Sequence, residues 1–294
     1  MAVTARAPRH RSQKPFFEST AGRWVRIYLP LFLFVLVTLF PFYWMIVTSF
    51  KSDQELLDHN ANPMFVIVPT LHHYQFLFFE SHFAQWLLNT TIIAVVSTAI
   101  SLFCSVLAGY ALARLRFRGA DSIGWGIFIT YLVPPTLLFL PLALLIKTFH
   151  LFNNLFALIL TYPTFLIPFC TWLLIGYFKS IPRELEESAL VDGATRLQAM
   201  VRVVVPLALP GILSAGMFAF TLSWGEFLYA LIFMNDTQTK TLPVGIVQEL
   251  IRGDDFFWGQ LMAAALLASI PVALLYSFFV EYFVAGMTAG AVKG

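Results

Sequence analysis

The sequence predicts an all-α integral membrane protein that crosses the bilayer six times. Three observations lead to this prediction: a very apolar composition, six apolar stretches of spanning length, and basic residues that gather on one side of those stretches. Of the 294 residues, 59% are hydrophobic and 12% are charged. Soluble domains carry about 25% charged residues, so this chain has roughly half the charge that a water-facing surface needs.

The six expected spans each reach the roughly 20 apolar residues that a helix needs to cross the hydrocarbon. They cover residues 25–50, 84–113, 122–146, 155–178, 207–234 and 258–284. Prolines inside several of them are expected to bend or trim the helices, and none has the alternating period of a barrel strand. The first run is too long for the apolar core of a signal peptide and no cleavage site follows it, so we expect it to be retained.

The basic residues set the expected orientation, because cytoplasmic loops are enriched in Lys and Arg. Fourteen of the eighteen lie before the first span or after the second, fourth and sixth spans, and four lie in the loops of the other side. We therefore expect both termini in the cytoplasm. The chain then divides into an N-terminal tail (1–24), a six-span domain (25–284) and a C-terminal tail (285–294). The loop 179–206 is the longest cytoplasmic connection.

This loop contains the stretch "PRELEESALVDGATRLQAM", which places four acids and two arginines between apolar neighbours. Pro182 suits a first helical turn, and the acids follow where the helix dipole favours negative charge. Gly193 is expected to end this helix in a left-handed cap. Thr195 and Gln198 have the spacing of a capping box and predict a second helix. Two capped helices around a glycine form a knob, but these signals alone leave docking and a solvated linker as open alternatives.

The segment "ESALVDGATRLQAMVRVVVPLALPG" is similar to the EAA-loop signature of permease subunits in bacterial ABC importers. That signature has E-A-A, three residues, G, nine residues and an apolar-x-apolar-P ending. It maps onto Glu187, Ser188, Ala189, Gly193, Val203, Val205 and Pro206. The one departure is Ser188, where the family prefers Ala, and one added hydroxyl should fit the same close contact.

Three further segments resemble the carbohydrate-importing branch of this family, the MalG type. They are "AGYALARLRFRG" (108–119), "FWGQLMAAALLASIP" (257–271) and the ending "FVAGMTAGAVKG" (283–294). The resemblance implies the six-helix ABC importer permease (MalG-like) fold with a cytoplasmic EAA coupling helix, in the bacterial inner membrane. It also implies import of a carbohydrate or related solute. The implied partners are a MalF-like second permease, two ATP-binding subunits, an extracytoplasmic solute-binding protein and membrane lipid, with no nucleic acid.

The resemblance also implies which residues meet the ATP-binding subunits. In the loop they are Glu187, Ser188, Ala189, Asp192, Gly193, Val203 and Pro206. In the C-terminal tail, which enters the motor interface in maltose-type importers, they are Thr288, Gly290, Lys293 and Gly294. No Gly-rich phosphate loop ending in Gly-Lys-Ser/Thr occurs. We therefore expect no catalytic residues, metal or cofactor in this chain, and ATP and Mg to be bound by partner subunits.

The candidate residues of a translocation pathway are Trp224, Glu226, Tyr229 and Asn89. Glu226 is an acid inside an expected span, and it lies roughly 28 Å along a helix begun at residue 207, near the outer end. There it could accept sugar hydroxyls, with the Trp224 ring stacking on a pyranose face. The alternative is a structural acid, either hydrogen-bonded to a neighbouring helix or exposed at the outer mouth.

Other features of the sequence leave their roles open. Small residues every fourth position, Gly211, Ala215, Ala219 and Ser223, fit intrachain packing as well as contact with a second permease. The outer loop 235–257 is charged and is expected to reach towards the binding protein. His72 and His73 would diverge on a helix or strand, so we expect solvated surface rather than metal.

Two rival functions differ in class from the importer. A secondary carrier or channel would need ionisable residues near the midplane and an internal repeat, and neither is clear in the sequence. A membrane-embedded enzyme would need polar groups clustered at one depth. The sequence does not identify the solute.

Overall fold

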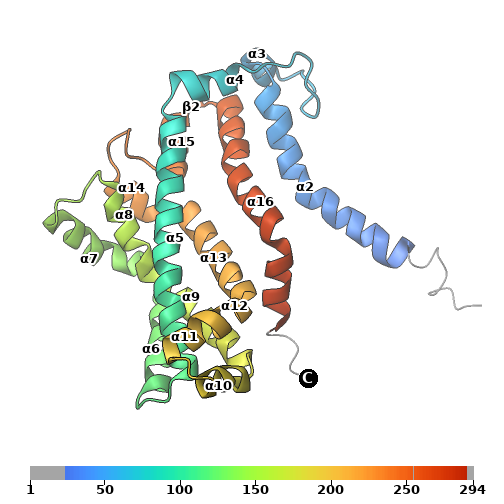
Figure 1. Cartoon of the computed structure of the whole chain (residues 1–294). Helices are drawn as coiled ribbons and strands as arrows, with labels where there is room; N and C mark the ends of the chain where they lie inside the picture. Colours follow the sequence, from blue (N-terminus) through green and yellow to red (C-terminus); the bar gives the residue numbers. More distant parts are fainter. Residues whose placement is uncertain (1–23, 254, 290–294) are drawn as a thin grey trace, which may run out of the picture.

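The structure is a computed structural model that describes residues 24–253 and 255–289, with side chains described as far as residue 280. Nearly all of this part is helical, and the helices run side by side in an elongated bundle (Figure 1). Four spans are long and apolar enough to cross a membrane as single units, namely Trp24–Phe50, Phe83–Arg114, Leu155–Ser180 and Trp258–Val280. Two bent helix pairs bring the number to six. The protein is therefore a multi-pass membrane protein.

The first span is a π-type turn, Trp24–Tyr28, followed by α2 (Leu29–Phe50). In Figure 1 this helix leans away from the body of the bundle, and its main contact is with α16 (Trp258–Ala289). Apolar side chains cover its surface, and Phe34 is 69% exposed. Such a face is stable only against lipid or another apolar subunit.

The third expected span is bent. Helix α6 (Ala120–Leu132) and helix α7 (Pro135–Thr148) meet at 92°. Pro134 lies between the two helices. It lacks a donor N–H and has an extended ψ of 129°, so α6 and α7 cannot form one continuous helix. The expected bending by proline is confirmed here, and a single straight span over 122–146 is not found.

The fifth span also differs from its expected course over 207–234. The chain turns by 75° between the segment 196–207 and α13 (Leu209–Trp224), and a separate helix, α14 (Leu228–Phe233), follows α13. Gly225 takes the C-cap of α13 with φ −90° and ψ 3°. The break after Trp224 places Glu226 between two helices and corrects the expectation of an acid inside a continuous helix.

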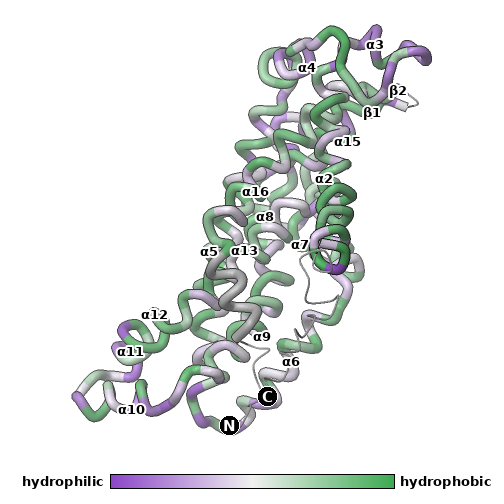
Figure 2. The backbone as a smooth tube through the Cα atoms, turned by 90° about the vertical axis from the view of Figure 1, so that its right-hand side faces the viewer, coloured by the Kyte–Doolittle hydropathy of each residue, from purple (hydrophilic) through white to green (hydrophobic). Residues whose placement is uncertain are grey.

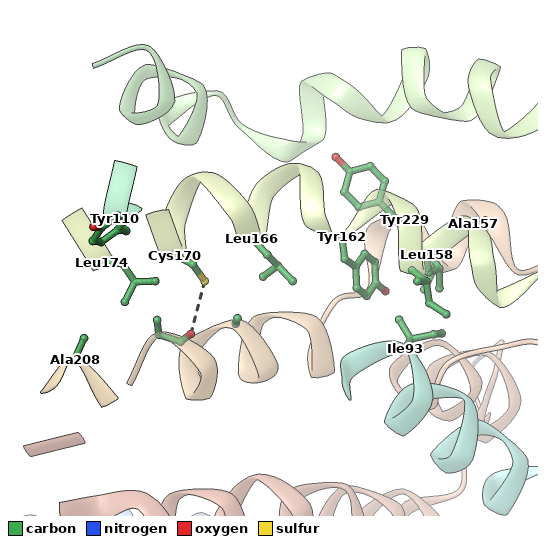
Figure 3. Packing of buried hydrophobic residues seen from close by; sticks show 14 of the residues in the cluster. Ile93, Tyr110, Ala157, Leu158, Tyr162, Leu166, Cys170, Leu174, Ala208 and Tyr229 are labelled. Atoms are coloured by element: carbon green, nitrogen blue, oxygen red, sulfur yellow. Dashed lines mark hydrogen bonds between the residues drawn. The ribbon is translucent and has the colours of Figure 1, made fainter. Parts of the chain in front are cut away.

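Three helices form the packed centre: α5 (Phe83–Arg114), α9 (Pro163–Ser180) and α13, with α8 (Leu155–Thr161) completing the α9 span. Figure 3 shows buried side chains of this core, including Cys170, whose Sγ donates to the Ala215 carbonyl over 3.8 Å. A Cβ on Gly211 would lie 2.4 Å from Cγ of Tyr177. The small-residue stripe of α13 is buried in this centre, which decides for intrachain packing.

Polar residues collect at the two ends of the bundle (Figure 2). The end that we call the α4 end holds α3 (Asp53–Leu57), α4 (His72–Gln75), the π-type turn η3 (Phe76–Glu80), α15 (Leu242–Leu250) and the antiparallel strands β1 (Ile251–Arg252) and β2 (Asp255–Phe256). The opposite end, which we call the α10 end, holds α10 (Arg183–Val191), α11 (Arg196–Ala199), η4 (Met200–Val204) and α12 (Val205–Leu207).

One expectation at the α4 end is wrong. His73 was expected on a solvated surface, yet it is fully buried and its Nε2 lies 2.7 Å from the Lys51 carbonyl oxygen. The local pattern could not show this, because the burying surface comes from α16 and from Lys51 at the end of α2. A Cβ on Gly259 of α16 would lie 2.1 Å from the His73 ring.

Candidate functional site

Helix α10 ends as the sequence predicts. Gly193 has φ +88°, the left-handed value at which a side chain is strained. Its N–H donates to the Leu190 carbonyl over 3.1 Å, and the Ala194 N–H donates to the Ala189 carbonyl over 3.0 Å. These two bonds form a Schellman motif, which satisfies carbonyl groups that the helix end would leave free.

The second helix of the knob begins as predicted too. The Gln198 N–H donates to Thr195 Oγ1 over 3.3 Å, and the Thr195 N–H donates to Gln198 Oε1 over 2.9 Å, so the capping box is complete. The chain then continues through η4 towards Pro206 of α12. The two-helix knob of residues 182–200 therefore has a fixed shape at both of its caps.

The residues that the signature selects lie mainly on the surface of this knob. Glu187, Ser188, Asp192, Gly193 and Pro206 are exposed, and Ala189 and Val203 are half-buried. Large apolar side chains are exposed on the knob at Leu185 (45% exposed), Val191 (87%) and Leu197 (64%), and just after it at Val201 of η4 (53%). Apolar groups held outwards on a charged knob are typical of a surface that contacts another protein.

One acid of the knob faces inwards, and sequence reasoning missed it. Glu186 is 7% exposed, and the Tyr110 hydroxyl donates to its Oε1 over 2.5 Å. Arg114 Nε lies 3.7 Å from Glu186 Oε2. The sequence pattern alone groups this residue with its acidic neighbours, which the helix dipole favours. Glu186 is the buried residue of this short helix because its position faces the end of α5.

A hollow of about 510 Å³ lies beside the contact between the end of α5 and the knob. It is lined by Arg114, Leu115, Arg116, Arg183, Glu186, Glu187, Leu190 and Arg196. Positive groups outnumber negative ones in this lining. The excess favours anionic or strongly polar neighbours at this end of the bundle.

Glu226 lies in the break between α13 and α14, and its carboxylate is occupied. The N–H groups of Tyr229 and Ala230 donate to it over 2.8 and 3.2 Å, and the Tyr162 hydroxyl donates over 2.8 Å. The carboxylate thus caps the N-terminus of α14 and bonds the α8–α9 junction. This geometry supports the structural alternative.

The two aromatic pathway candidates are also engaged within the chain. Trp224 Nε1 donates to the Ala268 carbonyl over 3.1 Å, and the Trp224 ring stacks on Phe220. The Tyr229 hydroxyl donates to the Pro135 carbonyl over 2.7 Å. Both side chains are buried, so neither offers an open face to a sugar in this conformation.

Asn89 is separate from the other three candidates. It is buried, and its Nδ2 donates to the carbonyls of Gln238 and Lys240 over 2.8 and 3.0 Å. It borders a hollow of about 460 Å³ lined by His82, Gln85, Asn89, Leu155, Gln238 and Thr239. These polar groups could meet a hydroxylated solute, but the structure does not bring them together with Glu226.

The tail candidates fall at the limit of the structure. The backbone of Thr288 lies in the final turn of α16, which continues five residues beyond the expected span end at 284. Gly290, Lys293 and Gly294 lie outside the described residues. In the part of the chain that the structure describes, no group of three His, Cys, Asp or Glu side chains is placed to hold a metal ion.

A family model described as the inner membrane component of binding-protein-dependent transport systems matches residues 105–289, more than half of the chain. The chain belongs to this family. It is therefore a membrane-spanning permease subunit of an ABC importer. This membership supports the importer over the carrier, channel and enzyme alternatives.

Several similar proteins are permeases of sugar transport systems. The permease SmoH of the sulfoquinovosyl glycerol transport system of Agrobacterium fabrum is 40% identical over 87% of this chain and 89% of its own length. The ABC transporter permease YcjP of Escherichia coli is 36% identical over 92% and 96%. The trehalose/maltose permease MalG of Thermococcus litoralis is 34% identical over 89% and 94%.

A solved structure shares the fold. A chain of a bacterial ABC transporter that imports the acidic polysaccharide alginate superposes with a TM-score of 0.78, covering 92% of this chain and all of that one. Its sequence identity is 22%, so the match shows the fold alone.

Proposed function

We propose that this permease subunit moves a carbohydrate or related solute into the cytoplasm across the bacterial inner membrane. The sugar-transport names of relatives at 34% and 40% identity support the solute class. The fourteen-to-four division of basic residues supports a cytoplasmic position for the α10 end and both termini.

The partners in this proposal are a MalF-like permease, two ATP-binding subunits that hold ATP and Mg, and an extracytoplasmic solute-binding protein. A second solved relative of the fold, 16% identical, is an alginate transporter in complex with a periplasmic protein. That arrangement belongs to the other protein, and it guides the choice of partners to test.

The observation that carries the proposal is the knob of residues 182–200. Hydrogen bonds fix the caps of both of its helices. The side chains of Val191 and Leu197 are exposed, so they do not pack into the core of this chain. A linker between two spans has no need of exposed apolar residues on a rigid frame. A surface that docks an ATP-binding subunit does, with Glu187 and Asp192 available to basic or amide groups.

The test is Gly193→Leu with Gly119→Leu as its matched control. The two glycines have φ of +88° and +89°, and a Cβ on either meets nothing within 4 Å. Both changes should cost about 1–2 kcal/mol of backbone strain. Only the Gly193 variant adds bulk to the knob, so only this variant should lose the ATP-binding subunits on co-purification, as should Glu187→Lys.

Equal retention of the ATP-binding subunits by the parent, Gly193→Leu and Glu187→Lys would overturn the docking proposal. The solute class has a separate assay. The partner binding protein should gain thermal stability from at least one member of a panel of trehalose, maltose, diacetylchitobiose and sulfoquinovosyl glycerol. A binding protein stabilised only by amino acids or peptides would overturn the carbohydrate assignment.

A further inference from the structure

Helix α5 is bonded at both ends to segments that are remote in the sequence. At the α10 end it carries Tyr110 and Arg114, which hold Glu186 of the knob. At the α4 end it carries Trp86 and Asn89, which hold the connection between α14 and α15. In Figure 1 this helix runs the length of the bundle between the two polar ends.

The attachment at the α10 end, which we call the lower mount, is a buried ionic cluster. Arg114 and Glu186 have side-chain exposures of 3% and 9%. Arg114 Nη2 also donates to the Ile181 carbonyl over 2.7 Å, at the link between α9 and α10. Arg183 Nη2 donates to the Ala113 carbonyl over 3.4 Å. Removing one partner of a buried ion pair leaves the other uncompensated, so the cluster resists separation of α10 from α5.

The attachment at the α4 end, which we call the upper mount, is a set of hydrogen bonds to one loop. Trp86 Nε1 donates to the Thr237 carbonyl over 2.7 Å. Asn89 donates to two further carbonyls of the loop. Thr90 Oγ1 accepts the Leu242 N–H over 2.7 Å, where α15 begins. The loop 234–241 is therefore held by α5 through its backbone and moves with it.

The helix between the mounts is built to stay straight. It has 32 residues, and no proline interrupts it. Internal prolines occur in α2, α7, α9 and α16, at Pro41, Pro141, Pro168 and Pro271. Proline removes a helical hydrogen bond and permits a kink. At 1.5 Å per residue α5 spans about 48 Å, enough to join the two sides of a bilayer.

We propose that α5 is a rigid rod that transmits movement of the knob to the outer loop 234–241, with Glu186 as the positioning residue of the lower mount. This inference rests on the proposed docking of the knob to an ATP-binding subunit. Displacement of α10 is carried into α5 by the ionic cluster and into the loop by the upper mount. The loop faces the side from which the solute arrives, so the rod connects the motor to solute entry.

The experiment uses the complete transporter with its ATP-binding subunits and an environment-sensitive fluorophore on Gln238→Cys, an exposed position of the loop. Mg-ATP with vanadate is the stimulus, so the solute need not be known. In the parent the fluorophore should respond to the stimulus. Glu186→Gln should reduce the response about tenfold, within the range usual for coupled sites, while the ATP-binding subunits stay bound.

The matched control is Glu55→Gln. It breaks the Lys51–Glu55 pair, whose atoms lie 3.6 Å apart and whose side chains are 5% and 7% exposed. This pair is buried to the same degree as the lower mount but lies at the α4 end, outside the rod. The control should keep the response, which separates a specific connection from general loosening. The exchange Glu186→Arg with Arg114→Glu should restore part of the response.

An unchanged response in Glu186→Gln would overturn the rod, as would a parent whose fluorophore is silent to the stimulus. Should Glu186→Gln fail to assemble, Tyr110→Phe removes a single hydroxyl of the lower mount, and the same two outcomes apply. Failure of docking is read separately, from Gly193→Leu. Equal retention of the ATP-binding subunits by the parent, Gly193→Leu and Glu187→Lys contradicts the docking of the knob, whatever the fluorophore does.

Discussion

The knob at the α10 end and the break around Glu226 are built on the same local chemistry but leave their side chains in opposite states. Both interrupt a helix at a glycine and begin the next helix with a capping side chain. In the knob, Glu187 and Val191 are exposed. In the break, the Glu226 carboxylate accepts three hydrogen bonds from within the chain. Polar groups that are hydrogen-bonded within the chain stabilise the fold, whereas exposed side chains on a rigid segment remain available to bind a partner.

We therefore expect substitutions in the two regions to have opposite effects. Changes in the break should lower stability without altering subunit binding per folded molecule. Changes at exposed side chains of the knob, such as Glu187→Lys, should lower subunit binding without lowering stability. Variants of the break, of the α13 packing and of the C-terminal tail should have effects that decrease in that order.

Glu226→Ala should have the largest effect on stability. It leaves two buried N–H groups and the Tyr162 hydroxyl without their acceptor, at about 1–3 kcal/mol for each group left unsatisfied. Glu226→Gln keeps one acceptor oxygen and should lose less. The measurement is the melting midpoint of the detergent-solubilised protein. A normal melting midpoint with a changed half-saturation for solute would place Glu226 in the pathway instead.

Gly211→Ala should come next, because the added Cβ would lie 2.4 Å from the Tyr177 ring. Overpacking of this kind costs about 1–3 kcal/mol. Gly176→Ala is the matched control, since a Cβ there meets nothing within 4 Å. The control should melt at or above the parent temperature, as Ala favours a helix over Gly. Equal melting of the two variants would mean that α13 and α9 are not packed as described.

Deletion of residues 288–294 should have the smallest effect. The ending resembles tails that enter the motor interface, so the deletion should lower the ATP hydrolysis of the assembled transporter. It removes seven small or polar residues, and the protein should still insert and melt normally. Unchanged hydrolysis would show that Thr288, Gly290, Lys293 and Gly294 take no part in coupling.

The sequence predicted what depends on short-range order. Spanning length, the left-handed Gly193 and the Thr195–Gln198 capping box all follow from spacing along the chain, and the structure contains each of them. The break at Gly225 was missed because apolar residues continue on both sides and hide it from a hydropathy pattern.

Contacts between residues that are far apart in the sequence could not be predicted either. The burial of Glu186 depends on Arg114, and that of His73 depends on Gly259, residues that are 72 and 186 positions away in the chain. No local pattern contains that information. The positions of the signature residues were easier to predict from the sequence. They lie on an exposed segment whose shape is set by its own caps and not by contacts with distant residues.

Docking of the knob to an ATP-binding subunit can be observed by photo-cross-linking. A photoreactive amino acid at Val191 (87% exposed, on the knob) is compared with one at Phe103 (68% exposed, on the apolar flank of α5) in membranes that hold the complete transporter. We expect the photoreactive group at Val191 to capture an ATP-binding subunit and the one at Phe103 to capture none. Capture from Phe103 with none from Val191 would contradict the docking of the knob.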